Sequence, residues 1–273
     1  MKKHRLRSGE VAVLGIPFDE NSSYRRGPAK GPAAIREVLF SGSSNLSAES
    51  GFDLAESGRW KDLGDIGFGE IESTVSSLVQ NGIRVLALGG DHSILFPIIN
   101  ATAPAYERLT ILQLDAHPDL YDEFDGNRQS HACPAARIME SHSNVRLVQI
   151  GIRSLNTHQR DQAERFGVET ITASEWARKP HPDVLPDLDG PVYISLDMDV
   201  LDPAFAPGVS HHEPGGLSTR DIISLIQSIH NPVIGADIVE LNPERDPVGI
   251  TAAAAAKFLK EIVDRMSGNV NRP

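Results

Sequence analysis

Short, mostly apolar segments recur along the whole chain, and this pattern constrains the fold more than any other feature of the sequence. In several segments the apolar residues are continuous rather than alternating, as in strands that are covered on both faces of a sheet. Parallel neighbours of this kind need a long crossover, usually a helix, between consecutive strands. The segments predict strands at Val11–Ile16, Val85–Leu88, Thr110–Leu114, Val145–Ile150, Val168–Ile171, Val192–Leu196 and Val233–Ile238.

Helical spacing of apolar residues is clear in three stretches. One helix is predicted from its apolar face over residues 71–79, with Gly82 as its C-terminal stop. A second opens at Ser218, where Asp221 completes a pattern like a capping box, and a third is Thr251–Met266. Alternating strands and helices predict an α/β fold with helices on both faces of a mostly parallel sheet.

Length, charge and cysteine content narrow the class of protein. The 273 residues contain no repeat or linker, so one domain spanning residues 1–273 is expected. The formal net charge of −11 argues against a nucleic-acid partner, because phosphate binding needs clustered cations. No segment approaches the roughly 20 apolar residues that span a bilayer. The single cysteine, Cys133, is expected to be a small buried residue rather than a catalytic thiolate, and a cytoplasmic location is expected.

Potential metal ligands follow the predicted strand that ends at Leu114. In parallel α/β sheets the ligand site lies at the carboxyl ends of the strands. If the chain stays extended there, Asp115, His117 and Asp119 point to the same side. Aspartate and proline are also common turn residues after a strand, but that alternative leaves three same-side ligand types in five positions unexplained. A metal site is therefore favoured.

Three further strand ends carry residues of the same kind. Asp197 and Asp199 follow one strand, and two buried carboxylates this close repel each other unless a cation lies between them. His92 follows a Gly-Gly turn, and Glu240 ends the last strand. Taken alone, His92 fits a packed or capping histidine better, and Glu240 fits a structural acid.

Together the motifs supply two histidines and four aspartates, which suits two metal ions better than one. Oxygen ligands with imidazole and no thiolate favour Mn²⁺ over Zn²⁺. Paired ions of this kind can activate water near neutral pH. The six candidate ligands are His92, Asp115, His117, Asp119, Asp197 and Asp199.

Four motifs resemble the signature set of the ureohydrolase family, which includes arginases and agmatinases. They are GGDHS (89–93), DAHPD (115–119), SLDMDVLDP (195–203) and VELNP (239–243). Finer features are similar to plant-type arginases, namely YDEFDGNRQSHA (121–132), GIRSLN (151–156) and DPAFAPGVSHHEPGGLS (202–218). Agmatinases typically have Gly-Thr-Pro-Glu where this chain has Ser-His-His-Glu (210–213).

The resemblance implies a three-layer α/β/α sandwich around a central parallel sheet of roughly eight strands, and a homo-oligomer, either a trimer or a hexamer. It also implies two Mn²⁺ ions per chain. One would be held by His92, Asp115, Asp119 and Asp197, and the other by His117, Asp115, Asp197 and Asp199, so that Asp115 and Asp197 bridge. His131 would match the family's proton-transfer histidine, and Glu240 would match the acid that pairs with the guanidinium.

The substrate implied by the resemblance is a small cationic guanidino compound. L-Arginine, cleaved to L-ornithine and urea, is favoured, and agmatine or another guanidino acid is the alternative. Uncharged donors for a substrate carboxylate are expected among Asn127, Ser130, Ser154, Asn156 and His211. His212, in the same loop as His211, replaces the apolar residue or proline usual in the family, and its role is left open.

Two other classes remain as alternatives. A metal-dependent deacylase of related fold would use one zinc ion, and the complete set of six ligands disfavours it. A non-catalytic binding relative would be expected to lack ligands or the acid at Glu240, and here all are present.

Overall fold

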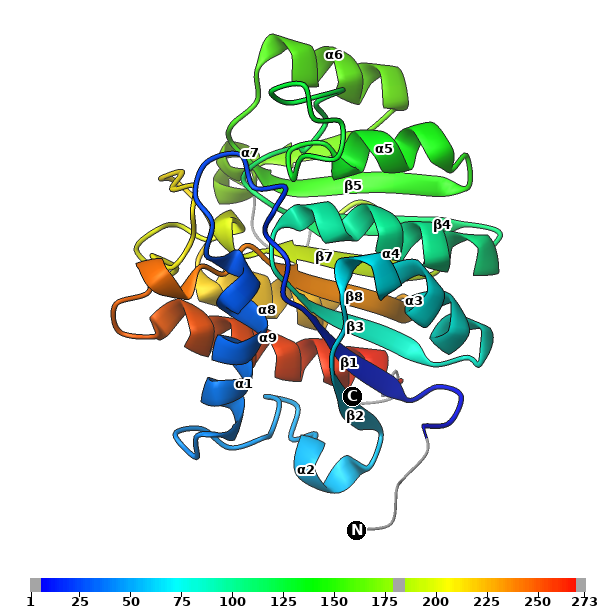
Figure 1. The fold of residues 1–273 in the computed structure, drawn as a ribbon, viewed down its shortest axis with the longest axis vertical. Coiled ribbons are helices and arrows are strands. Elements are labelled where there is room, and N and C mark those ends of the chain that lie inside the picture. The colour runs from blue at the N-terminus through cyan, green and yellow to red at the C-terminus, as the bar shows by residue number, and fades with distance from the viewer. Residues whose placement is uncertain (1–5, 179–184, 269–273) are drawn as a thin grey trace.

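The computed structural model describes residues 6–178 and 185–268, and within them eight parallel strands form one sheet (Figure 1). The strand order is β2-β1-β3-β8-β7-β4-β5-β6. The strands are β1 (Val11–Ile16), β2 (Trp60–Asp65), β3 (Arg84–Gly89), β4 (Leu109–Leu114), β5 (Val145–Ile152), β6 (Glu169–Thr172), β7 (Val192–Asp197) and β8 (Val233–Val239).

Helices cover both faces of this sheet, as the alternation of strands and helices predicts. Side chains of α1, α2, α7, α8 and α9 pack with one face of the strands in one apolar core. Those of α3, α4, α5 and α6 pack with the other face in a second core. The helices are α1 (Gly31–Phe40), α2 (Leu54–Ser57), α3 (Ile71–Gln80), α4 (Leu95–Thr102), α5 (Pro134–Ser141), α6 (Thr157–Phe166), α7 (Ala173–Arg178), α8 (Thr219–Ser228) and α9 (Ile250–Met266). The predicted three-layer α/β/α sandwich is confirmed.

The seven predicted strands are confirmed, and the eighth, β2, escaped the apolar pattern. β2 lies at the edge of the sheet, and its side chains alternate between half-buried and exposed. An edge strand with one wet face needs few apolar residues, so WKDLGD carries no continuous apolar run. At α8 the predicted start is confirmed in detail, because Ser218 and Asp221 form a capping box.

The strand order brings the candidate residues together. The chain passes from β3 to β4 across a gap that β7 and β8 fill later, so these four strands are consecutive neighbours in the middle of the sheet. Ligand sites form where the winding of such a sheet changes direction. In the part of the chain that the structure describes, no helix is both long and apolar enough to cross a membrane.

Candidate functional site

His92 lies at the centre of the first group of candidate ligands. It opens a 3-10 turn directly after β3 and is 1% exposed. Its Nδ1 lies 3.2 Å from Asp115 Oδ2, 2.9 Å from Asp119 Oδ2 and 3.3 Å from Asp197 Oδ2. Three buried carboxylates thus face one ring nitrogen. Like charges crowd in this way only around a cation, which can be a proton on Nδ1 or a metal ion.

The hydrogen bonds of His92 Nε2 indicate that the other ring nitrogen, Nδ1, carries the lone pair and faces the carboxylates. His92 Nε2 lies 2.9 Å from Ser195 Oγ, and the Ser195 hydroxyl donates to Asp237 Oδ1 at 2.9 Å. A hydroxyl that donates its proton to Asp237 accepts one from His92, so Nε2 carries hydrogen in the neutral ring. Nδ1, which has no well-oriented hydrogen-bond partner, is then the metal-ligating atom. A hydrogen-bond partner on the nitrogen that does not bind the metal commonly orients a metal-binding histidine.

A second group forms beside the first and shares a member with it. His117 Nδ1 lies 2.9 Å from Asp199 Oδ2 and 3.7 Å from Asp115 Oδ1. The donor atoms of His92, Asp115 and Asp119 lie within 4.8 Å of one another, and so do those of Asp115, His117 and Asp199. Asp115 belongs to both groups, with one oxygen turned to each histidine. The donor atoms therefore fit two adjacent cations with Asp115 between them.

The residues after β4 converge through a turn rather than through strand alternation. β4 ends at Leu114, and Asp119 has a left-handed backbone with φ of 51°. Within the turn His117 N donates to Asp115 Oδ1 at 2.6 Å. The loops after β4 and β7 are also joined directly, since Ala116 N donates to Asp199 Oδ1 at 3.1 Å. The three side chains do meet, but the extended geometry expected for them is wrong.

Electrostatics favour bound cations at this cluster. Burial, followed by the charge of Asp115, raises the pKa of Asp119 to about 6. Burial raises the pKa of Asp197 strongly, and Asp199 and Asp115 add to the rise. A raised carboxyl pKa means that the charged form is disfavoured where it lies. A divalent cation reverses this by supplying the missing positive charge.

Polar residues inside the strands support the ligands, and the sequence analysis missed them. Gln113 Nε2 donates to Asp115 Oδ2 at 2.8 Å. Gln149 Nε2 in turn donates to Gln113 Oε1 at 2.9 Å and to the carbonyl oxygen of Pro118 at 2.6 Å. Such residues, with Asp237, could have been found as polar interruptions of apolar strands, because buried polar groups need a partner.

Glu240 and His131 form a second polar centre next to the ligands. Glu240 has a left-handed backbone with φ of 63°, a conformation rare outside glycine that often marks functional sites. Its Oε1 accepts from the backbone N–H of His92 at 2.9 Å and from His131 Nδ1 at 2.7 Å. Burial lowers the pKa of His131, but the charge of Glu240 and this hydrogen bond outweigh it and raise the pKa to about 9.

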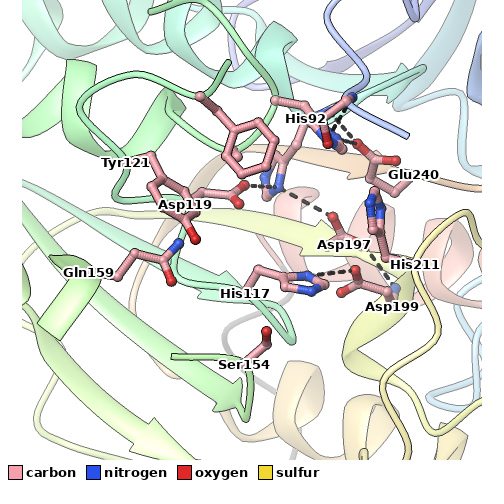
Figure 2. Close-up of a pocket in the computed structure, with 14 residues that line it drawn as sticks. His92, His117, Asp119, Tyr121, Ser154, Gln159, Asp197, Asp199, His211 and Glu240 are labelled. Carbon is pink, nitrogen blue, oxygen red and sulfur yellow. Dashed lines mark hydrogen bonds and ion pairs between the residues drawn. The ribbon is translucent and has the colours of Figure 1, made fainter. Parts of the chain in front are cut away.

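A cavity of about 150 Å³ opens onto these groups. Figure 2 shows His92 and Glu240 on one side of it, with Tyr121 and Gln159 on the opposite side. Among the described residues, neither lysine nor arginine lines it, so acids, histidines and neutral side chains determine its charge. The lining residues are Ser23, His92, His117, Asp119, Tyr121, Phe124, His131, Ala132, Ser154, Gln159, Asp197, Asp199, His211 and Glu240.

Two of the five predicted substrate contacts, Ser154 and His211, line this cavity. Asn127, Ser130 and Asn156 do not. Asn156 caps α6 by accepting from Gln159 N at 2.9 Å. Asn127 Oδ1 accepts from the N–H of the nearby Gln129 at 2.8 Å, and Ser130 is 3% exposed beside a separate cavity.

Outside the predicted set, two residues have clear positions. The exposed His212 Nε2 lies 2.8 Å from the carbonyl oxygen of Pro207 and does not line the cavity. Cys133 is buried, as expected, and burial raises the pKa of its thiol to about 12. Sequence reasoning missed Ser23, Tyr121, Phe124 and Gln159, which are ordinary loop or helix residues in the sequence and reach the cavity only through the fold.

Replacing Ser195 by alanine is expected to weaken metal binding by about tenfold to a hundredfold. The variant removes the hydroxyl that accepts from His92 Nε2, so the ring loses the contact that turns the Nδ1 lone pair to the carboxylates. Titration calorimetry with Mn²⁺ on the metal-free protein measures this. Ser210→Ala, which removes a hydroxyl bonded to a loop carbonyl, is the matched control. Equal affinity in Ser195→Ala and wild type would contradict the orienting role.

Comparisons with known proteins agree over almost the whole chain. The model of the arginase family matches residues 9–264. Arginase 1, mitochondrial, of Arabidopsis thaliana is 44% identical, over 94% of this chain and 81% of that protein. The agmatinase of Bacillus anthracis is 36% identical, over 96% of this chain and 94% of that protein. The solved structure of arginase from Medicago truncatula has a TM-score of 0.85 at 40% identity, and covers 94% of this chain and 87% of that one.

These names correct one expectation. The cytoplasmic location expected from the sequence is wrong by this comparison, because the plant relatives at 42–44% identity include proteins named mitochondrial or chloroplastic/mitochondrial. Composition and the absence of a long apolar run, on which that expectation rested, carry no information about an organellar address.

Family membership follows from three agreeing observations. The family model spans nearly all described residues, several relatives exceed 30% identity over most of both chains, and the fold superposes on a solved arginase. The alternatives of a one-zinc deacylase and of a non-catalytic binding protein are set aside by this result. The chain therefore belongs to the arginase family, as a ureohydrolase of the arginase and agmatinase type that hydrolyses guanidino carbon–nitrogen bonds.

Proposed function

We propose that this protein is a manganese-dependent arginase that cleaves L-arginine to L-ornithine and urea. The observation that carries the proposal is the position of Asp115, shared by two His/Asp groups beside the buried acid Glu240. The higher identity to plant arginases than to agmatinases supports arginine as the substrate.

Six residues would hold two Mn²⁺ ions, with Asp115 and Asp197 common to both. The first ion would take His92 and Asp119 in addition, and the second His117 and Asp199. The donor set of carboxylate oxygens and imidazole nitrogens, without a thiolate, favours Mn²⁺ over Zn²⁺. When bound, such ions supply Lewis acidity and make water a stronger nucleophile near neutral pH.

Glu240 and His131 would handle the charge and the proton of the substrate. Among the described residues both hydrogen bonds to Glu240 use Oε1, which leaves Oε2 for a charge-assisted bond to the guanidinium. Holding the planar guanidinium carbon in one orientation contributes by proximity. The leaving amine needs a proton, and His131, a lining residue of the same cavity, would donate it.

Selectivity between arginine and agmatine is the finer test of the proposal. The two substrates differ only in the α-carboxylate. Ser154, Gln159 and His211 line the cavity and could donate to that group. The lack of lysine and arginine among the described lining residues favours agmatine as the second candidate.

We expect kcat/KM for arginine to exceed that for agmatine by at least about tenfold, which is about 1.4 kcal/mol of transition-state binding. Urea release from both substrates, at equal Mn²⁺ loading and against metal-free protein, measures this. A tenfold preference for agmatine would overturn the choice of arginine and leave the ureohydrolase activity in place.

Three further proposals concern the assembly and the metal. We propose one domain over residues 1–273, supported by the single sheet that joins the described parts of the chain.

A trimer or hexamer is proposed from the family resemblance, and light scattering would measure the oligomeric state. Elemental analysis should find two manganese ions per chain, and Mn²⁺ should restore chelated protein better than Mg²⁺ or Zn²⁺.

A further inference from the structure

Ser23 contacts Nε2 of His131, the ring nitrogen that does not face Glu240. It lies in the loop after β1 and lines the cavity. Its hydroxyl oxygen is 2.8 Å from His131 Nε2, and its backbone N–H donates to the same nitrogen at 3.1 Å. On the other side of the ring, Nδ1 lies 2.7 Å from Glu240 Oε1. The imidazole is therefore held between Ser23 and Glu240.

These contacts determine where the proton of the neutral ring lies. A backbone N–H can only donate, so Nε2 must present a lone pair to Ser23. Nδ1 then carries the hydrogen and donates it to the carboxylate of Glu240. When the ring gains a second proton, that proton binds to Nε2. The Ser23 hydroxyl can then accept a hydrogen bond from Nε2–H, which the backbone N–H cannot do. Ser23 Oγ is thus suited to both protonation states of the ring.

Burial gives this contact its importance. His131 is 8% exposed, whereas Ser23 lies among exposed residues of its loop. The side chain facing His131 Nδ1, Glu240, is 4% exposed, and the oxygen that it turns to the ring also accepts from the N–H of His92. A buried general acid must recover a proton in every turnover, and of the two side chains that contact the ring nitrogens, Ser23 is the one that belongs to an exposed residue.

The loop that carries Ser23 is fastened on both sides. Asp91 Oδ2 accepts from the N–H of Asn21 at 3.0 Å and lies 3.3 Å from the hydroxyl of Ser22. The backbone N–H of His131 donates to the carbonyl oxygen of Asn21 at 3.1 Å. The position of Ser23 relative to the imidazole is thus set by contacts that do not involve its own side chain.

We propose that Ser23 is a positioning residue that exchanges protons between His131 and solvent, which rests on the role proposed above for His131. Ser23 Oγ passes its proton to Nε2 and takes one from a water molecule or a buffer acid, so the serine ends unchanged. The donor becomes hydroxide or the conjugate base, and the imidazolium then protonates the leaving amine. In the reverse direction Nε2 returns a proton to solvent by the same route.

The first test is the pair Ser23→Ala and Ser23→Thr in the Mn²⁺-loaded enzyme. We expect Ser23→Ala to lower kcat about tenfold, less than loss of His131 itself, because water can partly replace the hydroxyl. KM and metal content should stay within twofold of wild type. Raising the concentration of imidazole buffer should restore part of the lost kcat, and Ser23→Thr, which keeps a hydroxyl, should restore most of it. Ser41→Ala, whose exposed hydroxyl donates to the carbonyl oxygen of Val38 outside the cavity and outside this loop, is the control and should keep kcat within twofold.

Charged groups around His131 shape the pH profile of this variant. Glu240, Asp119 and Asp91 raise the pKa of His131 against the effect of burial, and His211 faces it with ring centroids 5.3 Å apart. A hydroxyl that accepts from Nε2–H favours the charged ring, so its loss lowers the pKa. The alkaline limb of the kcat profile should therefore move to lower pH in Ser23→Ala, a change that loop packing alone would not cause.

The neutral tautomer can be read without any turnover. Long-range ¹H–¹⁵N correlation spectra of histidine-labelled, metal-free protein, recorded above the pKa of about 9, should show hydrogen on Nδ1 of His131 and none on Nε2. The Nε2–H tautomer would overturn the proposal, as would an unchanged kcat in Ser23→Ala, or a loss that neither threonine nor buffer restores. If wild type with Mn²⁺ released urea from neither arginine nor agmatine, the proposed function would fail instead, and the tautomer would still test the geometry.

Discussion

Replacing Asp197 by asparagine is expected to abolish urea release and to leave the metal-free protein at least as stable as wild type. Asp197 is 3% exposed, with Oδ2 3.3 Å from His92 Nδ1 and Oδ1 accepting from Asp199 N at 2.8 Å. An amide of the same shape keeps much of this packing but removes a charge shared by both proposed ions. Loss of metal catalysis corresponds to about 4 kcal/mol or more, roughly a thousandfold in kcat/KM.

The stability of the metal-free protein separates a ligand from a structural residue. Burial, with Asp199 and Asp115, raises the pKa of Asp197 above its unfolded value. A carboxyl group of this kind destabilises the fold above its unfolded pKa, where folding opposes ionisation, and this cost disappears as the pH falls below that value. Removing the charge should thus not lower the free energy of unfolding at neutral pH. Wild type should gain melting temperature on adding Mn²⁺, and Asp197→Asn should gain much less.

Asp202→Asn is the matched control for this variant. Asp202 lies in the same loop and accepts from the backbone N–H groups of Ala204 and Gly215, outside the cavity. It should retain two ions and near-normal activity. Urea assays, elemental analysis and thermal melts with and without Mn²⁺ complete the comparison. If Asp197→Asn kept both ions and full turnover, the assignment of the metal site would be wrong.

The sheet was predictable because its central strands are buried on both faces. The predicted bounds of β1 agree with the structure at both ends, and those of β7 agree to within one residue. The reason is that a continuous apolar run ends where the chain leaves the core. β2 was not, because an edge strand keeps polar residues on its outer face. α6 was not singled out either, since its sequence, THQRDQAERF, is mostly polar and gives little apolar periodicity.

The ligand cluster was predictable for a topological reason. Residues at the carboxyl ends of β3, β4 and β7 meet whenever those strands are near neighbours in a parallel sheet, so residue type and strand end suffice. The detailed path of each loop was not predictable in this way. Asp119 reaches His92 through a left-handed turn, and Glu240 stands on another.

Contacts from loops far apart in sequence were the least predictable part of the site. Asn127 and Asn156 satisfy backbone groups of their own loops, and such local bonds compete with a role in binding. Ser23 and His131 are 108 residues apart in the sequence. They meet because the contact between Asn21 and Asp91 holds the Ser23 loop in place. A pattern of residues along the chain contains no signal for that contact.

His131→Asn is expected to lower kcat by about 10²–10⁴-fold, with two metal ions retained. His131 contacts Glu240 and Ser23 rather than the proposed ligands, so its loss removes a proton donor and not a metal donor. The pKa of His131 is lowered by burial but raised further by Glu240, to about 9. Donation needs the protonated ring, and bound cations lower the pKa of a neighbouring imidazolium, so wild-type kcat with Mn²⁺ should fall on the alkaline side, at or below this pH. The variant should lack that alkaline limb.

His158→Asn is the control for the loss of an imidazole near the same cavity. Its ring stacks on Tyr121, with centroids 5.7 Å apart, but does not line the cavity, so kcat should stay within about threefold of wild type because no proton donor is lost. Profiles of kcat against pH and elemental analysis of all three proteins decide the outcome. Because an asparagine can hold Glu240 by a hydrogen bond but cannot become a cation, a low and pH-independent kcat in His131→Asn identifies proton donation as the missing function. Loss of manganese in that variant would instead make His131 a ligand and refute its role as the proton donor.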